Sequence, residues 1–550
     1  MAAWIQATII LAVVVGLHVP LGDYMARVLE GGRPGRAEKA LYRLCGINPD
    51  KEQSWRHYLT AVLAFSFISI AALFTLFTLQ GKLPWSAGHE GMPWRLALHT
   101  AVSFTTNTSW QNYAGESTTG HLAVMAGLGV QAFASAAVGI CVALALVRGL
   151  VRRSTDDLGN FWVDLLRTIF RVLVPIAVLG GLVLMAGGVV QSLGGGHTVT
   201  TVAGTAQQTI PDGPVASWEA LKLFSGDGGG VFNANSAHPF ENPTAWTNAF
   251  EIVLMLLIPT ACIRMFGRLI GSLKQSWTLL TVVGILFGLL LAAGTLAQSA
   301  HTGTVTEAVG GQYEGTETRF GIPGSTLFGI AATGSADGAA NASYDSFSSL
   351  GGGVLLAAMM LGEIAPGGTG SGLYGLIIVV LVAVFIGGLM VGRTPEYLRK
   401  RIGYAEMRWV VVYALIPPTV ILTCSAFALA MGDAQSSMGN AGAHGLTELI
   451  YAYTSNTNSN GSAMAGFNGA TDFHNLLMVV AMLAGRYLPM VCVLALAGRL
   501  ARQQPGVVTV GTLRAQGVNF VVLATAASVI LALLNFLPAL SLGTIADGLM

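Results

Sequence analysis

The chain has 550 residues, of which 53% are hydrophobic and 10% are charged, and its formal net charge is +1. Soluble domains carry about 25% charged residues, so this composition excludes an ordinary soluble protein and favours one unit embedded in membrane lipid. The balanced charge offers no electrostatic basis for binding nucleic acid.

Apolar stretches long enough to cross a bilayer follow one another along the chain. A transmembrane helix needs about 20 largely apolar residues, and such stretches lie at 3–21, 57–79, 121–148, 168–191, 246–266, 276–298, 409–431, 474–498 and 515–537. The first lacks the basic start and cleavage site of a signal peptide, so we expect it to be retained. A further tract, 347–391, is too long for one ordinary span and is interrupted at 362–372 by GEIAPGGTGSG.

The basic residues decide how often this long tract crosses. Of the 28 Lys and Arg residues, 23 lie in five loops, at 27–56, 148–171, 264–274, 393–408 and 499–514. Basic loops mark the cytoplasmic side, and all five lie on one side only if 347–391 crosses once. We therefore predict ten crossings, both termini outside the cytoplasm, and a helix broken within the membrane. Such a break is tolerated only inside protein or beside a watery cavity, so it indicates an ion or substrate pathway.

Four shorter semi-apolar segments lie in the connections on the other side. They span 93–105, 215–226, 324–333 and 444–454, a length that suits a re-entrant helix rather than a crossing. Each ends in a turn rich in Gly, Thr, Ser or Asn, and these turns are the candidate filter loops 106–111, 225–230, 333–338 and 454–461. Two crossings separate each from the next, so all four enter from the same face.

The pattern predicts an all-α integral membrane fold with about ten transmembrane helices and four span–loop–span repeats arranged with pseudo-fourfold symmetry, as in potassium channels. The first transmembrane helix and a basic loop occupy 1–56, and the last helix occupies 501–550. Between them lie the four repeats, at 57–148, 164–268, 275–392 and 409–500.

Four such loops on one axis can present a ring of backbone carbonyls that replaces the hydration shell of an ion. Glycine allows the backbone to approach the ion closely, and the negative ends of the short helices favour a cation. The alternative is that each tract is an ordinary extracellular turn. Regular spacing and the preceding apolar helix favour a filter.

These tracts resemble the potassium-binding A subunit of the bacterial Kdp potassium-transporting ATPase, a family related to the Trk, Ktr and HKT potassium transporters. The segments that carry the resemblance are TNTSWQNYAGE (106–116), GGGVFNANSAHPFENPT (228–244), GEIAPGGTGSGLYG (362–375), GRTPEYL (392–398) and NSNGSAMAGFNG (458–469). The resemblance runs over essentially the whole chain.

The resemblance implies potassium uptake across the bacterial inner membrane and a complex with a catalytic P-type ATPase B subunit, an accessory C subunit and a small single-span subunit. It places filter glycines at Gly229, Gly338 and Gly461, with Gly228 or Gly230 as alternatives in the second loop and Gly334 in the third. The full set of candidate potassium-binding residues is Thr106, Asn107, Thr108, Ser109, Gln111, Gly228, Gly229, Gly230, Thr333, Gly334, Gly338, Asn458, Asn460 and Gly461.

The resemblance also implies that the broken helix supplies a gating loop beneath the filter, with candidate residues Glu363, Gly367, Gly368 and Arg486. Arg486 lies at the centre of the 474–498 helix, where a charge is costly and usually faces a cavity or a partner. It is either a positive gate or a charge paired for packing, with Glu363 as the candidate partner. Glu363 is either part of the gate or a capping or ion-paired carboxylate.

The segment His238–Pro243 follows the second filter loop. Zinc needs three or four ligands, and no second His or Cys stands at ligand spacing, so we interpret this segment as a rigid loop that braces the filter.

The sequence lacks a GxxxxGK[ST] loop and a DKTG phosphorylation motif. We therefore expect no catalytic residues and no cofactor, with potassium as the cargo and ATP hydrolysis in a partner subunit. A stand-alone Trk/Ktr-like channel or symporter is the first alternative. An intramembrane enzyme is the second, but no nucleophile–base pair or metal cluster is visible inside the spans.

Overall fold

The structure is a computed structural model, and it describes the chain except residues 1, 33, 205, 301–311, 507–514 and 550. Within the described residues, ten helices are long and apolar enough to cross a membrane. Their bounds are α1 Ala2–Glu30, α3 Trp55–Leu79, α6 Val130–Val151, α7 Phe161–Arg167 continued by α8 Val174–Ala186, α10 Ala245–Leu269, α11 Leu273–Gln298, α15 Ser371–Met390, α16 Tyr404–Ala430, α19 Asp472–Arg502 and α20 Val518–Leu540. The predicted count of ten crossings is therefore confirmed.

Three of these helices form the interior of the molecule. Residues of α6, α10 and α15 are mostly buried, whereas α3 and α20 expose most of their apolar surface. Small residues allow the inner helices to approach closely. A Cβ added to Gly149 of α6 would lie 2.6 Å from the carbonyl oxygen of Ala497 on α19, so this crossing requires glycine.

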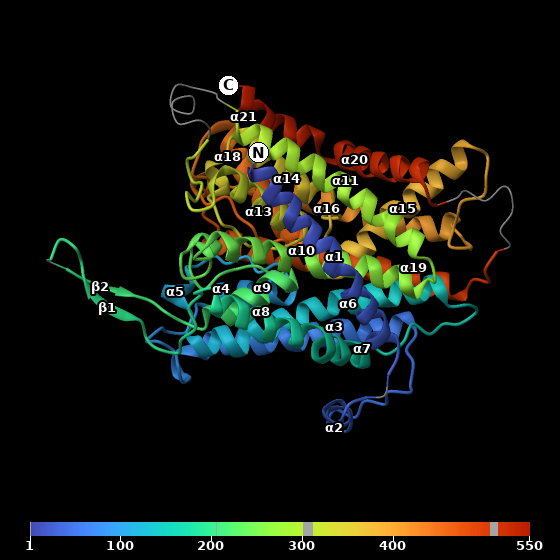
Figure 1. The fold of residues 1–550 in the computed structure, drawn as a ribbon, viewed down its shortest axis with the longest axis horizontal. Helices are drawn as coiled ribbons and strands as arrows, with labels where there is room; N and C mark the ends of the chain where they lie inside the picture. Colours follow the sequence, from blue (N-terminus) through green and yellow to red (C-terminus); the bar gives the residue numbers. More distant parts are fainter. Residues whose placement is uncertain (1, 33, 205, 301–311, 507–514, 550) are drawn as a thin grey trace.

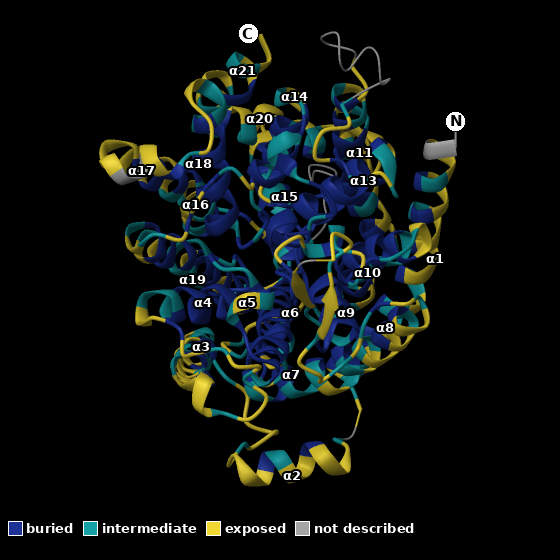
Figure 2. Cartoon of the chain, turned by 90° about the vertical axis from the view of Figure 1, so that its left-hand side faces the viewer, coloured by how far each residue is buried: buried dark blue, intermediate teal, exposed yellow. Residues whose placement is uncertain are grey.

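Four short helices enter the molecule from one end, which we call the loop face. They are α4 Trp94–Thr105, α9 Val215–Ser225, α13 Gly321–Gly334 and α18 Gly442–Asn458. Figure 2, which looks along the long helices, shows them at four corners around a common centre. They match the four re-entrant segments predicted from the sequence, although α13 begins three residues earlier and α18 ends four residues later.

The long apolar tract is one broken helix, as predicted. Its first half is α14, Ser349–Met360, and its second half is α15, which begins at Ser371. Residues 361–370 between them form turns in which Gly362, Glu363, Gly367 and Gly370 have positive φ angles. The glycines of this segment explain why the helix stops, since they adopt such angles without steric cost.

Some elements were not predicted. An antiparallel hairpin, β1 His197–Thr200 with β2 Gln207–Ile210, projects from the loop face at the left of Figure 1. A second pair, β3 Glu396–Tyr397 with β4 Lys400–Arg401, lies at the opposite end. The remaining short helices are α2 Arg36–Leu44, α5 Gly115–Thr118, α17 Gly432–Ser437 and α21 Ala546–Leu549. The fold is thus helical with two small peripheral sheets.

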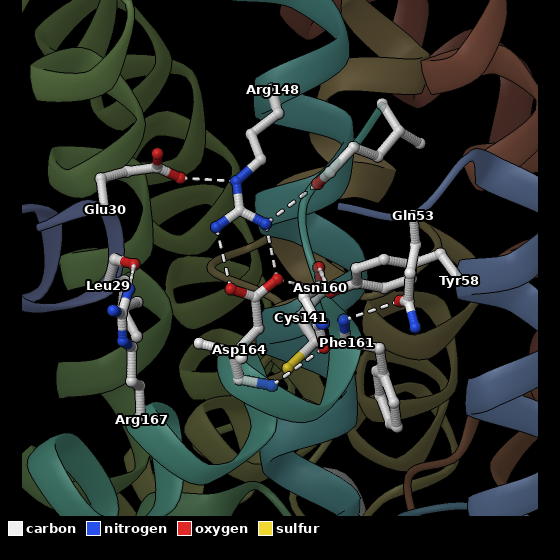
Figure 3. Close-up of polar contacts among 12 residues, drawn as sticks. Leu29, Glu30, Gln53, Tyr58, Cys141, Arg148, Asn160, Phe161, Asp164 and Arg167 are labelled. Atoms are coloured by element: carbon white, nitrogen blue, oxygen red, sulfur yellow. Dashed lines mark hydrogen bonds and ion pairs between the residues drawn. The ribbon is translucent and has the colours of Figure 1, made fainter. Parts of the chain in front are cut away.

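A buried ionic network fastens four helices together at the end opposite the loop face. Arg148 of α6 donates to both carboxylate oxygens of Asp164 on α7, at 2.5 and 2.9 Å, and to Glu30 of α1 at 2.7 Å (Figure 3). Tyr58 of α3 also donates to Asp164, at 3.0 Å. Removing one partner of such a buried pair costs about 3–5 kcal/mol, so the network fixes these four helices as one scaffold.

Candidate functional site

A residue of left-handed conformation follows each of the four short helices, one or two residues after the helix ends. These residues are Asn107, Gly226, Ala336 and Ser459, with φ angles of 62°, 61°, 56° and 63°. We call this residue position 1 of its filter loop and number onward from it. The near-identical angles show that the four chain reversals have the same geometry.

A hydrogen bond fixes the register of each loop. The N–H of position 2 donates to a carbonyl of the preceding helix, which belongs to a residue we call the anchor. The four bonds are Thr108 to Ser103 (2.9 Å), Asp227 to Lys222 (3.0 Å), Asp337 to Ala332 (2.9 Å) and Asn460 to Ser455 (2.9 Å). Position 3 is then Ser109, Gly228, Gly338 and Gly461. In this register Gly228, rather than Gly229 or Gly230, is the counterpart of Gly338 and Gly461.

Loops 1 and 2 are joined by side chains. The amide of Asn107 donates to the carbonyl of Gly226, and the hydroxyl of Ser109 donates to the carboxylate of Asp227. Gln111 adds a further tie, because its side-chain oxygen accepts from the N–H of Gly230 at 2.8 Å.

The other loops meet through backbone. A Cβ on Gly228 would overlap Gly338, and a Cβ on Gly461 would overlap the carbonyl oxygen of Thr108. A Cβ on Gly338 would lie 2.9 Å from the carbonyl oxygen of Asn460. Loop 1 therefore touches loop 2, loop 2 touches loop 3, loop 3 touches loop 4, and loop 4 touches loop 1. Positions 1 to 3 of the four loops form a closed ring, which we call the filter ring.

Three of the predicted site residues belong to helices instead. Thr333 and Gly334 form the last turn of α13, and Asn458 is the last residue of α18. The predicted fourth loop, 454–461, therefore begins too early, since residues 454–458 are helical. The amide of Asn458 donates to the carbonyl of Met359 at 2.8 Å, which ties α18 to the end of α14.

A hollow of about 870 Å³ opens above the filter ring on the loop face. Residues from all four loops line it, among them Ser109, Gly229, Gly338 and Gly461. The ring thus has an open vestibule on one side.

The turn of the broken helix lies on the other side. The N–H of Gly367 donates to the carbonyl of Gly334 at 2.8 Å, and the hydroxyl of Thr369 donates to the carbonyl of Phe224 at 3.2 Å. A Cβ on Gly368 would lie 2.9 Å from the Cβ of Ala336. The segment 361–370 is therefore packed directly against the ends of α9 and α13.

Arg486 and Glu363 line one small cavity of about 120 Å³ beneath loop 4, together with Thr457, Asn458 and Ser459. Both side chains are buried. Arg486 donates to the carbonyl of Ser135 on α6 at 3.2 Å, and within the described part of the chain no ion pair joins it to Glu363. The pairing considered from the sequence is thus not formed.

Sequence reasoning missed five residues of the ring, which are Gly226, Asp227, Ala336, Asp337 and Ser459. Asp227 and Asp337 occupy position 2 of loops 2 and 3, are fully buried, and each has one carboxylate oxygen without a partner among the described residues. Both lie within the candidate filter loops 225–230 and 333–338 but are not among the candidate potassium-binding residues. They become equivalent only when the loops are aligned on position 1, the left-handed residue of each.

Comparisons with known proteins agree with this architecture. Residues 8–549 match the family described as "Potassium-transporting ATPase A subunit". Proteins named potassium-transporting ATPase potassium-binding subunit are 49% identical in Kineococcus radiotolerans, covering 100% of this chain and 98% of the relative, and 50% identical in Mycolicibacterium smegmatis, covering 98% of each. The crystal structure of the potassium transporter TrkH from Vibrio parahaemolyticus is similar in fold, with a TM-score of 0.55, 13% identity, and coverage of 80% of this chain and 85% of that one.

Proposed function

The chain belongs to the family of potassium-transporting ATPase A subunits, and from this premise we propose that it binds potassium in the filter ring and passes it inward as the ion-binding subunit of an ATP-driven uptake complex. The observation that carries the proposal is the closed ring of four loops with one register. Such a ring can surround a single dehydrated ion with backbone carbonyls.

Potassium enters the vestibule and loses its water at positions 1 to 3 of the four loops. The C-terminal ends of α4, α9, α13 and α18 all point toward the ring, and their partial negative charges stabilise a cation there. Asp227 and Asp337, at position 2 of loops 2 and 3, add carboxyl oxygens close to the ring. Below it, the segment 361–370 obstructs the path sterically, and Arg486 opposes it electrostatically.

We further propose the surroundings that the family implies. The loop face is extracytoplasmic in the bacterial inner membrane, with both termini on that side, because the basic loops gather at the other end. The names of the relatives support an assembly of several subunits. Within it we expect a catalytic P-type B subunit, an accessory C subunit and a small single-span subunit.

The alternative is a stand-alone channel or symporter, which the fold similarity to TrkH favours. Co-purification from native membranes separates the two. We expect a tagged chain to bring down an ATPase subunit and to show ATP hydrolysis stimulated by potassium. A chain that purifies alone and conducts potassium in liposomes without ATP would support the alternative and contradict the proposal.

A further inference from the structure

Loop 2 differs from the other loops in its anchor residue. The anchors of loops 1, 3 and 4 are Ser103, Ala332 and Ser455, whereas the anchor of loop 2 is Lys222, which is fully buried. An unpaired ammonium beside a cation pathway would repel the ion. Neighbouring groups must therefore neutralise the charge of this ammonium.

Buried carboxylates neutralise Lys222. Its ammonium lies 2.8 Å from Glu219 of α9 and 2.7 Å from Glu241, and both glutamates are fully buried. Glu251 of α10 is a third fully buried carboxylate close to these two. Charged groups are retained inside proteins when they are paired and hydrogen-bonded in this way, and Lys222 has two such partners.

The third contact of the ammonium leads to the filter. Lys222 donates to the side-chain oxygen of Asn235 at 2.8 Å, and the side-chain nitrogen of Asn235 donates to the carbonyl of Gly229 at 2.9 Å. The same Asn235 oxygen also accepts from the N–H of Ala340, just after loop 3, at 3.3 Å. One amide side chain thus connects Lys222, position 4 of loop 2 and the chain that follows loop 3.

Side chains hold the equivalent carbonyl in two other loops. At position 4 of loop 1, the carbonyl of Trp110 accepts from the hydroxyl of the anchor Ser103 at 2.9 Å. At position 4 of loop 3, the carbonyl of Ala339 accepts from the hydroxyl of Tyr344 at 3.1 Å. In three loops, therefore, a side chain outside the ring holds the position-4 carbonyl by a hydrogen bond. In loop 2 this side chain is Asn235, which is in turn bonded to the anchor Lys222.

We propose that Lys222 is a positioning residue for ion selection, which acts through Asn235 to fix the carbonyl of Gly229 and thereby the conformation of loop 2. The inference rests on the proposed function, because it assumes that loop 2 contacts potassium. A loop held in one conformation keeps its carbonyls at a spacing suited to one ion, whereas a loose loop can contract around a smaller one. Glu219 and Glu241 neutralise Lys222, so that its ammonium does not repel the potassium ion.

The test uses the purified complex with its partner subunits, in which ATP hydrolysis is measured against potassium and, separately, against sodium. Asn235→Gly removes the amide but tolerates the residue's φ angle of 55°. Loss of the hydrogen bond to the Gly229 carbonyl should raise the half-saturating potassium concentration about tenfold and reduce the preference for potassium over sodium. The maximal rate at saturating potassium should stay near that of the parent complex.

Lys222→Met should produce the same shift, and the double variant should shift no further, because the two residues act in series. Lys222→Arg, which keeps charge and donors, should recover part of the affinity. Lys82→Met, which removes an exposed lysine, is the matched control and should behave as the parent. If Lys222→Met fails to assemble into the complex, the potassium affinity and selectivity of Asn235→Gly and Lys222→Arg test the inference.

Unchanged potassium affinity and selectivity in Asn235→Gly would overturn the inference, as would fully additive effects in the double variant. A parent complex without potassium-stimulated ATP hydrolysis would instead contradict the proposed function, so the two failures are distinguishable.

Discussion

At the scale of single residues, the contact between loops 4 and 1 of the filter ring requires that position 3 of loop 4 has no side chain. Gly461 has a φ angle of 99°, and its Cα faces the carbonyl oxygen of Thr108 in the neighbouring loop. Any larger residue there must move one loop away from the other, because its Cβ would overlap this oxygen. A left-handed backbone also costs a residue with a Cβ about 1–2 kcal/mol. The geometry of the ring therefore depends on glycine at this position.

We predict that Gly461→Ala lowers potassium affinity at least about tenfold, since each 1.4 kcal/mol is about a factor of ten. The measurement is the potassium dependence of ATP hydrolysis by the complex. Gly284→Ala is the control, because a Cβ at Gly284 of α11 meets nothing within 4 Å. Equal potassium affinity in the two variants would remove Gly461 from the filter.

Arg486 is the second residue whose role can be tested singly. A cation about 4 Å from its guanidinium would be repelled by about 4 kcal/mol at an effective dielectric of 20, which is roughly a thousandfold in occupancy. We expect Arg486→Gln to convert coupled uptake into passive potassium leak in liposomes that carry the complex, without ATP. Arg486→Lys should leak less, because the charge remains although the fork geometry is lost.

The matched control is Arg499→Gln, on the same helix, where the arginine side chain is about half exposed and pairs with Glu406. It should stay coupled. A tightly coupled Arg486→Gln complex would show that the barrier lies elsewhere, with the loop 361–370 as the remaining candidate.

At the scale of elements, one histidine joins three segments on the loop face. His444, at the start of α18, lies 2.9 Å from Asp547 of α21 and 3.3 Å from Asp345, which follows loop 3. Glu448 also faces this group. The carboxylate of Asp345, then that of Asp547, raises the pKa of His444 to about 9, against the opposing effect of burial.

The sign of the resulting pH dependence follows from this shift. A histidine whose pKa rises on folding stabilises the structure fully below its unfolded value of about 6.5, and the contribution is lost as the pH rises through about 9. We therefore expect the backbone amides of α21 to lose hydrogen-exchange protection between these values. His444→Gln, compared at each pH, should remove the difference, and His57→Gln should not. Protection of α21 that stays equal in His444→Gln and parent at pH 6.5 would contradict this role.

The elements themselves could largely be predicted from the sequence, because the length and apolarity of a crossing are local properties. The end of α18 could not. Thr454–Asn458 are polar yet helical, and two of their side chains donate to backbone carbonyls, Asn456 to Ala452 and Asn458 to Met359, each at 2.8 Å. The change from apolar to polar residues near 454 marks the end of the apolar segment, whereas the helix itself continues to Asn458.

Site residues that depend on tertiary contact were equally hidden. The sequence does not distinguish Gly228 from its two neighbours, and it is identified by the register bond of loop 2 and by its contact with Gly338. The contacts of Lys222 could not be predicted either, because Asn235 and Glu241 reach its ammonium only when the segment after loop 2 folds back on α9.

At the scale of the whole molecule, the orientation in the membrane is testable with thiols. Four of the five cysteines are buried, and only Cys45 is exposed. In a Cys45→Ser background, Gly195→Cys and Gly432→Cys on the loop face should react with an impermeant reagent added to intact cells. Arg401→Cys should not, because its exposed side chain lies at the other end. Labelling at 401 from outside would contradict the ten-crossing orientation.

The joining of all four filter loops in one chain has a consequence for how such a pore can evolve. A ring assembled from four identical subunits must repeat every substitution four times, so its electrostatic potential changes in steps of four charges. Here Lys222 and Arg486 each occur in one quarter only. Mutation can therefore adjust the field along the axis by single elementary charges, and one quarter can specialise as a barrier while the other three keep coordinating the ion.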